Sequence, residues 1–528
     1  MRDSRHRGAC WWMTTALLWI CAPLFAASSP SLIDAARHAD ASAVRTLLQR
    51  GANPNERAGD GTTALHWAAY SGDLATVDML LQAGADANAA DDLGVTPLWA
   101  ASSTGQGPVV EHLVKAGARP NATLASGETS LMAASRVGSA GAVRALLAAG
   151  ADVNAREPLH EQTALMWASA ERHADVVQIL LDAGADIHVR SKVFPEVVNV
   201  AVQIFTNSGI SSGLSAKVVD ARAAERARGR TGGGGAGAAR PAAAANPAAA
   251  GGGVDVVDTS GIVEIQSGGY TPMLFAAQRG DVDSARLLIS KGADVNDAAP
   301  SGTSALVIAA HSGNSAMAAY LLDQRANPNA DGAGYTALHA AVLRRDTALV
   351  KALVAHGADL EIPVKKGTPA RRNATDYMLG GPVIGGTAYW LAARFNEPDV
   401  MRILAAAGAN KASTTPDGTT IVMAAMGTPW PGAGFALPPD PVEQERAALD
   451  TVKTALELGP DLNAVNKNGD TALHVAITRG FDSVVRTLLA AGARPDVKNK
   501  RGVTPLALAT RTGRDGTVEM LQKSGAKE

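Results

Sequence analysis

The chain has 528 residues, of which 48 are Lys or Arg and 50 are Asp or Glu, and its formal net charge is −2 at pH 7. It lacks the overall basicity on which many nucleic-acid-binding proteins depend, so we expect no nucleic-acid partner. Its length would suit several globular domains, but a repeated pattern predicts one elongated array instead.

Residues 1–28 have the layout of a Sec signal peptide. Three arginines precede an apolar run from Ala9 to about Ala22, and small residues follow this run. The run is shorter than the roughly 20 apolar residues that a membrane-spanning helix needs. Both cysteines, Cys10 and Cys21, lie in this segment, so the mature chain would have no disulfide and no cysteine-bound metal. We therefore expect a periplasmic or secreted protein with no membrane span after cleavage.

The stretch at residues 61–88, GTTALHWAAYSGDLATVDMLLQAGADAN, shows a pattern that ten later segments share. Thr63 can cap a first short helix, and Gly72 can take the left-handed conformation that ends it. Asp73 stands at the N-cap of a second helix, which Gly84 ends in the same way. Two helices this short cannot bury both of their apolar faces alone, so each unit needs a similar neighbour on each side.

This pattern resembles the ankyrin repeat, a hairpin turn plus two helices that opens with TPLH-x-A. Residues 31–55 carry the two helices without the Gly-x-Thr opening and are expected to form an N-terminal cap. Four units then open at Gly61, Gly94, Gly127 and Glu161, so we assign residues 31–190 to the cap plus four units. The resemblance implies an all-α ankyrin-repeat solenoid of about twelve helix-turn-helix units joined by hairpin turns, with three insertions.

Residues 191–268 form the first insertion. Its centre reads TGGGGAGAARPAAAANPAAAGGG, a low-complexity composition without a period, and should be flexible. The apolar residues 193–204 could dock on the solenoid, whereas residues 254–265 alternate enough to suggest a strand.

The array resumes at residue 269 and continues to residue 528. Two further insertions interrupt it, near 363–384 in a hairpin region and near 427–444 between two helices, where the chain is rich in proline. The seven units of this second part open at Gly269, Gly302, Gly334, Gly385, Gly418, Gly469 and Gly502.

The histidine of the TALH motif is the first candidate for a metal or catalytic role, and it occurs at His66, His339 and His474. Other units place Trp99 or Ala507 at the same position, which indicates a packing role. The sequence has no phosphate-binding loop, serine nucleophile elbow or His-Glu metal motif. We therefore predict a protein that is not an enzyme and that needs no cofactor or metal.

A second recurring position supplies the candidate binding residues. The two residues after the paired small residues end the first helix of each unit, and six of eleven units place an arginine there. Arginine suits carboxylate and phosphate partners, and aromatic side chains suit an interface. A solvated helix end, where cations favour the helix dipole, is the alternative. The candidates are Tyr70, Arg136, Arg279, Arg344, Arg394, Phe395, Arg479 and Arg511, together with Trp430 of the proline-rich loop, which could instead pack that loop onto its own repeat.

The resemblance implies protein–protein binding, although a fold alone does not fix a partner. We expect a monomeric, non-enzymatic scaffold of the cell envelope or secreted fraction that binds another protein, with an acidic surface, along its concave groove and loops. Two alternatives stay open: a secreted effector that acts on a host protein, and a hydrolase or transferase whose active site is built from the insertions.

Overall fold

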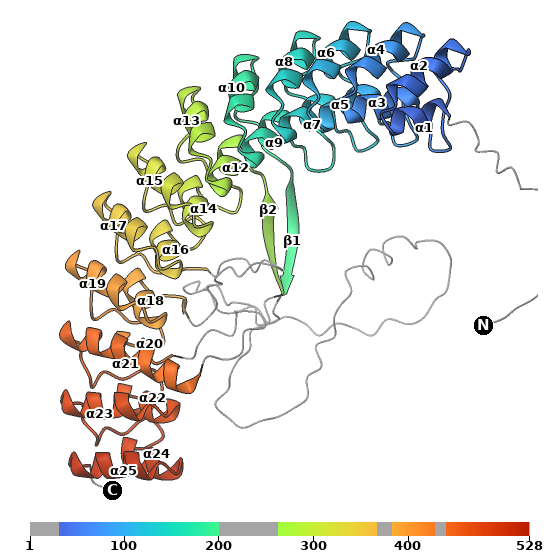
Figure 1. The fold of residues 1–528 in the computed structure, drawn as a ribbon. Helices are drawn as coiled ribbons and strands as arrows, with labels where there is room; N and C mark the ends of the chain where they lie inside the picture. The colour runs from blue at the N-terminus through green and yellow to red at the C-terminus, as the bar shows by residue number, and fades with distance from the viewer. Residues whose placement is uncertain (1–30, 200–261, 367–382, 428–439, 527–528) are drawn as a thin grey trace, which may run out of the picture.

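The computed structural model describes residues 31–199, 262–366, 383–427 and 440–526. In this part of the chain, twelve pairs of antiparallel helices stack into an arc (Figure 1), which confirms the predicted all-α solenoid. The predicted signal peptide, the low-complexity centre of the first insertion and most of the other two insertions lie outside the described residues.

The first helix of each pair lies on the concave side of the arc (Figure 1). These helices are α1 (Leu32–Arg37), α3 (Ala64–Ser71), α5 (Pro97–Ser103), α7 (Ser130–Val137), α9 (Ala164–Glu171), α12 (Pro272–Arg279), α14 (Ala305–His311), α16 (Ala337–Leu343), α18 (Ala388–Arg394), α20 (Ile421–Ala425), α22 (Ala472–Arg479) and α24 (Pro505–Arg511).

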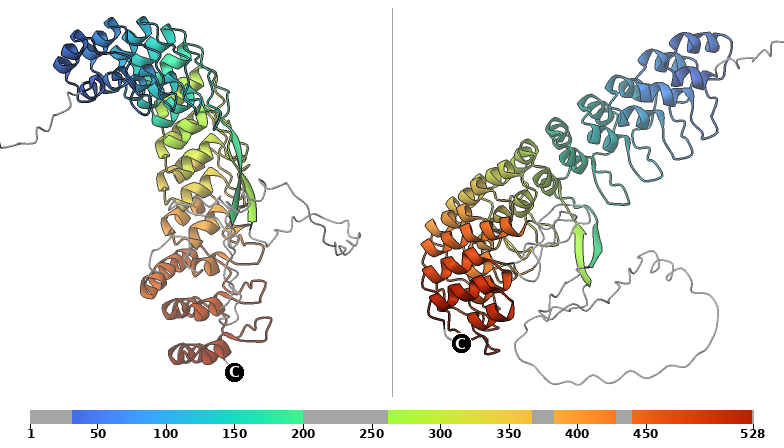
Figure 2. Two further views of the ribbon diagram at one scale, coloured as in Figure 1. Left: turned by 90° about the vertical axis from the view of Figure 1, so that its right-hand side faces the viewer. Right: turned by 60° about the horizontal axis from the view of Figure 1, so that its bottom comes forward.

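The second helix of each pair forms the convex layer (Figure 1). These helices are α2 (Ala41–Gln49), α4 (Leu74–Gln82), α6 (Gly107–Lys115), α8 (Ala140–Ala148), α10 (Ala174–Asp182), α13 (Val282–Ser290), α15 (Ser315–Asp323), α17 (Thr347–Ala355), α19 (Pro398–Ala406), α21 (Pro441–Glu457), α23 (Asp482–Ala490) and α25 (Asp515–Lys523). Loops between units project to one side of the helices, as the left view of Figure 2 shows.

The local structure of a unit follows from its cap residues. Thr63 and His66 form a capping box at the start of α3, and Gly72 ends this helix with φ 75°. Asp73 accepts a hydrogen bond from the N–H of Thr76 and so caps α4. The core lies between units: Ala68 and the other small residues of the first helices are fully buried, which lets neighbouring helices approach closely.

Polar side chains join each unit to the next along the loop side. In five units an asparagine donates from Nδ2 to a glycine carbonyl of the following unit and accepts an N–H from the same turn with Oδ1. These residues are Asn55, Asn88, Asn121, Asn154 and Asn329. A second set of side chains reaches back to the last carbonyls of the preceding first helix, as Thr104 does to Tyr70 of α3 (3.0 Å). Hydrogen bonds therefore join neighbouring units at two places, after the second helix of each unit and at the carboxyl end of the first helix.

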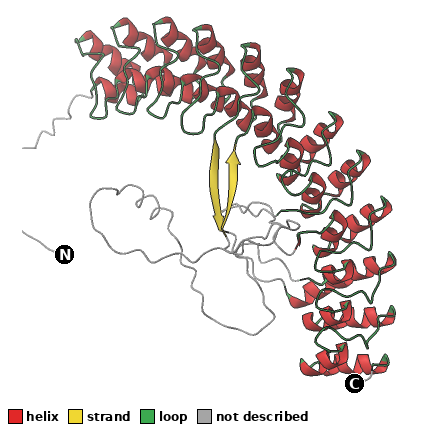
Figure 3. Cartoon of the chain, turned by 180° about the vertical axis from the view of Figure 1, so that it is seen from behind, coloured by secondary structure: helices red, strands yellow, loops and turns green. Residues whose placement is uncertain are grey.

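The first insertion leaves the array as a β-ribbon. Strand β1 (Val193–Asn199) pairs antiparallel with β2 (Ile262–Gly268), and Val193 is opposite Gly268. The ribbon extends from the loop side between α10 and α12, clear of the helices (Figures 1 and 3). At the base of β1 the ring of Phe194 meets that of His160 in the fifth unit, with centroids 5.6 Å apart, so the docking considered for residues 193–204 is present at that point. The backbone of β1 pairs with β2. The strand expected at 254–265 begins only at Ile262.

The proline-rich insertion changes the lengths of the helices beside it. Helix α20 has 5 residues, whereas α21 has 17 and begins at Pro441, inside the range expected for the insertion. Asp440 caps α21 by accepting the N–H of Val442 (3.0 Å), and proline suits the first helical turn.

Candidate functional site

The predicted partner-binding residues share one place in the repeat, the carboxyl end of the first helix. Arg344 and Phe395 are the C-cap residues of α16 and α18. Trp430 lies outside the described residues. The first helices form the concave layer, so these helix ends follow one another along it (Figure 1). The residues within the helices are Tyr70, Arg136, Arg279, Arg394, Arg479 and Arg511.

Tyr70 is the most exposed aromatic side chain of the described residues, with 54% of its surface accessible. Its ring meets the edge of Trp67, with the ring centroids 6.4 Å apart. The guanidinium group of Arg37 lies over Trp67, 4.6 Å from its centroid. The N-terminal end of the concave layer thus presents an aromatic and cationic surface of the kind that is enriched in protein interfaces.

Arg136 and Arg279 have carboxylate partners in the described ranges. Arg136 lies 3.3 Å from Glu128 and stacks on Trp167, 4.7 Å from its centroid. Burial raises the pKa of Glu128, and the charge of Arg136 opposes this effect. Arg279 approaches Glu171 at only 3.9 Å, and both side chains are about half exposed, so this pair contributes little stability.

Arg344 has a structural role that the sequence did not reveal. Its Nη2 atom donates to the carbonyl of His311 at the end of α14, one unit earlier. It therefore belongs to the set of side chains that cap the preceding helix, where a positive charge also favours the helix dipole. Its predicted role in partner binding stays a prediction.

The last three arginines differ in exposure. Arg511 is exposed at the end of α24. Arg394 and Arg479 are partly buried, and burial together with the charge of Arg479 lowers the pKa of Arg394 to about 10. Phe395 is also only partly exposed and packs against the core. The carboxyl ends of the first helices are thus not uniformly exposed to solvent. The helical period alone could not predict this difference.

The TALH histidines are structural. The backbone N–H of Thr63 donates to Nδ1 of His66 (3.1 Å), and Nε2 of His66 donates to the Val95 carbonyl in the next unit (2.9 Å). At the same position of another unit, the indole N–H of Trp390 donates to the Thr419 carbonyl (2.9 Å). The packing interpretation agrees with these contacts. Within the described ranges, no group of three or more His, Cys, Asp or Glu side chains could hold a metal ion.

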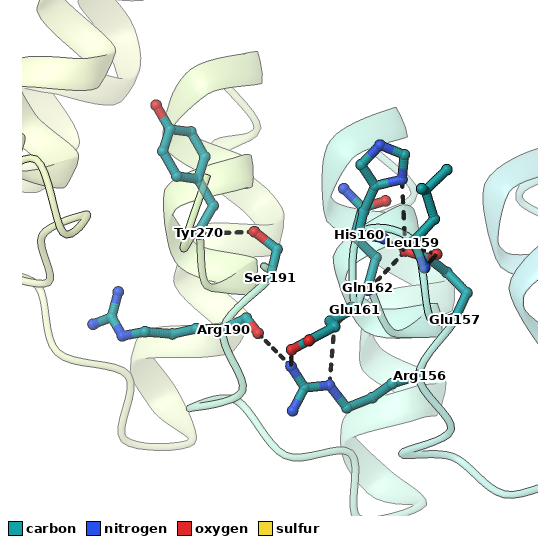
Figure 4. Close-up of polar contacts among 9 residues, drawn as sticks. All are labelled: Arg156, Glu157, Leu159, His160, Glu161, Gln162, Arg190, Ser191 and Tyr270. Carbon is teal, nitrogen blue, oxygen red and sulfur yellow. Dashed lines mark hydrogen bonds and ion pairs between the residues drawn. The ribbon is translucent and has the colours of Figure 1, made fainter. Parts of the chain in front are cut away.

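The loop of the fifth unit, before the ribbon, holds a dense polar network (Figure 4). The carboxylate of Glu157 is 5% exposed and accepts N–H groups from Leu159 (2.7 Å), His160 (2.9 Å) and Gln162 (3.0 Å). This network holds Leu159 at the loop tip, where 62% of its surface is accessible. These hydrogen bonds fix the shape of the loop. Because the Glu157 carboxylate is already bound by backbone N–H groups, we assign the network a structural role.

A second cluster closes the root of the ribbon. Ser191 donates its N–H to the Tyr270 carbonyl, and its hydroxyl accepts the Tyr270 N–H, both at 2.9 Å (Figure 4). Arg190 donates to the carbonyls of Gly269 and Ala298, both at 3.0 Å, and pairs with Asp297 at 2.5 Å. Arg190 also borders a cavity of about 310 Å³ between the fifth and sixth units. These contacts join residues more than 70 positions apart, so they could not be predicted from the spacing of residues in the sequence.

No helix in the described ranges is both long enough and apolar enough to cross a membrane.

Comparison with known proteins bears on the repeats. The family model described as "Ankyrin repeats (3 copies)" matches residues 32–124, 105–191, 273–364 and 443–528, well over half of the chain. A "Putative ankyrin repeat-containing protein" of Treponema pallidum (strain Nichols) is 35% identical over 127 residues. That match covers 23% of this chain and 43% of the relative, so the chain spans less than half of the relative's length.

Proposed function

The chain belongs to the ankyrin-repeat family, and from this premise we propose that it is a monomeric, non-enzymatic scaffold of the cell envelope or secreted fraction. Ankyrin repeats generally mediate protein–protein interaction, and the family is typically non-enzymatic. The proposed partner is a protein with an acidic surface that binds along the concave layer. The signal-peptide layout of residues 1–28 supports export.

The observation that carries the proposal is the alignment of the first-helix ends along the concave layer. They present Tyr70, Val137 and Arg511 to solvent, and Tyr70 and Val137 are among the few large apolar side chains that are exposed in the described ranges. Aromatic and arginine side chains dominate the energetics of many interfaces. A continuous array of such ends can engage an extended partner at several units at once.

Affinity capture from the native cell envelope tests the proposal. The purified chain is immobilised, and proteins that it retains are identified by mass spectrometry. We expect a specific partner whose recovery falls at least tenfold with Tyr70→Ala combined with Arg511→Glu, a loss of about 1.4 kcal/mol or more. The matched control is Arg486→Glu, an exposed arginine of the convex helix α23.

Two outcomes would count against the proposal. Equal recovery of the partner with the Tyr70→Ala, Arg511→Glu variant and with the Arg486→Glu control would place the interface elsewhere. Recovery of the chain only in the cytosolic fraction, with its N-terminus intact by mass spectrometry, would reject the export that the proposal includes. Size-exclusion chromatography with light scattering checks the monomeric state.

A further inference from the structure

The asparagine contacts between units are interrupted at the junction that carries the first insertion. In five other units an asparagine bonds the glycine carbonyl of the next turn and the N–H two residues later, as Asn154 does with Gly184 (3.4 Å) and Asp186 (2.8 Å). The fifth unit has His188 at the asparagine position, in the turn that follows α10. Among the described residues the side chain of His188 forms neither contact.

Two backbone groups of the sixth unit are therefore left open. They are the carbonyl of Gly292 and the N–H of Asp294, and neither has a hydrogen-bond partner within the described ranges. The turn itself is built as in other units. Asn296 donates its N–H to the Asp294 carboxylate at 2.8 Å, a bond that the turns of other units also have. The turn thus offers the same acceptor and donor that a carboxamide joins elsewhere.

A cavity of about 310 Å³ lies between the turns of the two units. Ile187 and His188 line it from the fifth unit. Ala293 and Asp294 line it from the sixth unit, and Met273 of α12, which is 1% exposed, gives it an apolar wall. A water molecule takes only about 30 Å³, so the cavity has room for a side chain from outside the chain.

Arg190 joins the two units at the edge of this cavity. It donates to the carbonyls of Gly269 and Ala298, both at 3.0 Å, and pairs with Asp297. These bonds hold the units together where the asparagine is missing. Because Arg190 is already engaged with a carboxylate and Asp294 adds a second negative charge to the lining, a neutral ligand fits the cavity better than an anion does.

The two open backbone groups select the chemical class of the ligand. A primary carboxamide carries a donor and an acceptor on one edge, so it can bond a neighbouring carbonyl and N–H together. A carboxylate has acceptors only and would face the Gly292 carbonyl without a proton to donate. A trans secondary amide directs its N–H and its C=O to opposite sides. The two ring nitrogens of His188 also point apart, so imidazole is no substitute for the asparagine side chain.

We infer that the cavity between the fifth and sixth units binds the primary carboxamide of an asparagine or glutamine side chain of a protein partner. The amide nitrogen donates to the Gly292 carbonyl and the amide oxygen accepts the Asp294 N–H. The aliphatic stem lies against Ile187 and Met273. The partner thereby supplies, from outside, the contact that asparagine makes within the chain at other junctions.

This site is separate from the predicted concave residues. Its lining includes Thr271, the N-cap of α12, whereas the predicted arginine and aromatic side chains lie at the carboxyl ends of the first helices. His188 and Arg190 are exposed at its rim, so a side chain can enter from solvent. The inference rests on the proposed function only for the source of the carboxamide, since a scaffold presents the site to another protein.

The test is an NMR titration of the whole purified chain with butyramide, which is a glutamine side chain cut off at its Cα atom. Labelling alanine carbonyls with ¹³C and aspartate nitrogens with ¹⁵N selects the Ala-Asp pairs, and loss of one signal in Asp294→Asn identifies Asp294. Butyramide should shift this signal saturably, with a Kd of about 1–10 mM for so small a ligand. The equivalent N–H groups that already bond an asparagine should not respond, and these belong to Asp86, Asp152, Asp186 and Asp359.

His188→Asn is the decisive variant, because it supplies the missing carboxamide from within the chain. It should move the Asp294 signal towards those of its equivalents and raise the Kd for butyramide about tenfold or more, since the site is then mostly occupied. His188→Ala is the matched control, because it removes the ring and leaves the cavity open, so butyramide should still bind. Circular dichroism confirms that both variants fold.

Three results would overturn the inference. The first is a shift with butyrate or N-methylbutyramide as large as that with butyramide, since neither can join the two backbone groups. The others are the absence of a saturable shift with butyramide and binding that persists in His188→Asn.

A peptide identifies the source of the carboxamide. Acetyl-Gly-Gln-Gly-methylamide should bind at least as tightly as butyramide, whereas its Glu counterpart should not bind. Failure of the glutamine peptide would reject a protein side chain as the ligand. These probes replace the cellular partner, so a failed affinity capture would count against the scaffold proposal and leave the carboxamide site standing.

Discussion

At the scale of single residues, a buried histidine links the stability of the array to pH. His339 is 1% exposed, and burial lowers its pKa from 6.5 to about 4. Its Nε2 atom has no well-formed hydrogen bond among the described residues. As the pH falls, the unfolded chain takes up the proton first. The contribution of neutral His339 to the free energy of unfolding is therefore complete above about pH 6.5, and it is lost as the pH falls towards 4.

We expect His339→Met to remove this pH dependence, because three other units bury methionine at the same position, Met132, Met166 and Met423. Between pH 7 and pH 5 the wild-type chain should lose about 2 kcal/mol of unfolding free energy that the variant keeps. Urea unfolding at the two pH values, followed by circular dichroism, measures the difference. Equal losses in both proteins would contradict the assignment, and the exposed His38→Met serves as the control.

The asparagines between units give a second prediction. Asn88 donates to the Gly117 carbonyl at 2.9 Å and accepts the Arg119 N–H at 2.8 Å. Asn88→Ala removes both bonds and should destabilise the chain by about 2 kcal/mol, since each bond contributes roughly 1 kcal/mol. Asn468→Ala is the control, because Asn468 is exposed and its hydrogen bond to Asn466 comes from the backbone. Indistinguishable urea midpoints would show that these bonds add nothing to the stack.

The sequence predicted the role of a residue where that role repeats. Tryptophan at position 99 and alanine at position 507 identified the histidine position as a packing site, and the contacts of His66 agree. The partners of the arginines could not be predicted in this way. Arg279 meets Glu171 across the first insertion, and Arg344 meets the carbonyl of His311 in another unit. Which way a long side chain turns at a helix end depends on its neighbours, not on the period.

At the scale of elements, the ribbon is closed at its root and the helices on either side remain neighbours. Ser191 and Tyr270 exchange two hydrogen bonds, and the N–H of Gly269 donates to the Lys192 carbonyl at 3.1 Å. Helices α9 and α12 pack directly on each other despite the insertion between them. The insertion is therefore an extension of one hairpin loop and not a break in the stack.

It follows that the insertion can be removed. Replacing residues 194–267 by Asn-Gly joins the facing residues Val193 and Gly268 through a two-residue turn. We expect Tm to stay within about 3 °C of the wild-type value, because the change leaves the helical contacts intact.

A matched variant tests the root itself. Arg190→Ala removes bonds to two carbonyls and leaves Asp297, which is 12% exposed, without its cation. This should cost about 2 kcal/mol or more. A large fall in Tm on deleting the insertion, with no effect of Arg190→Ala, would mean that the ribbon supports the array and the root does not.

Helices could be predicted from the sequence and the ribbon only in part. Each helix carries its own signals, such as Thr63 and Gly72, within a few residues. Strand β1 forms because residues 193–199 meet residues 262–268, and the alternation seen from residue 254 could not fix where that pairing begins. Strand pairing depends on a distant segment, which a local pattern does not contain.

At the scale of the whole molecule, each unit contacts its neighbours and stability is a sum of units and interfaces. The arc has no closure that would bring its ends together (Figures 1 and 2). Helix α20 near the C-terminus has only five residues. The first helix of the next unit, α22, therefore packs against a shorter helix than the first helices elsewhere do. We therefore expect the last two units, α22 to α25, to open independently of the N-terminal half.

Two equivalent core substitutions test this. Leu165 in α9 and Leu473 in α22 occupy the same place in their units, and both are fully buried. Each change to alanine should cost about 2–5 kcal/mol. By hydrogen exchange and mass spectrometry, Leu473→Ala should speed exchange in α22 to α25 and leave α3 to α8 unchanged, because few interfaces connect the site to the N-terminal units. Leu165→Ala lies inside the array and should speed exchange in units on both of its sides. Faster exchange in α3 to α8 with Leu473→Ala would show instead that the array unfolds as one cooperative body.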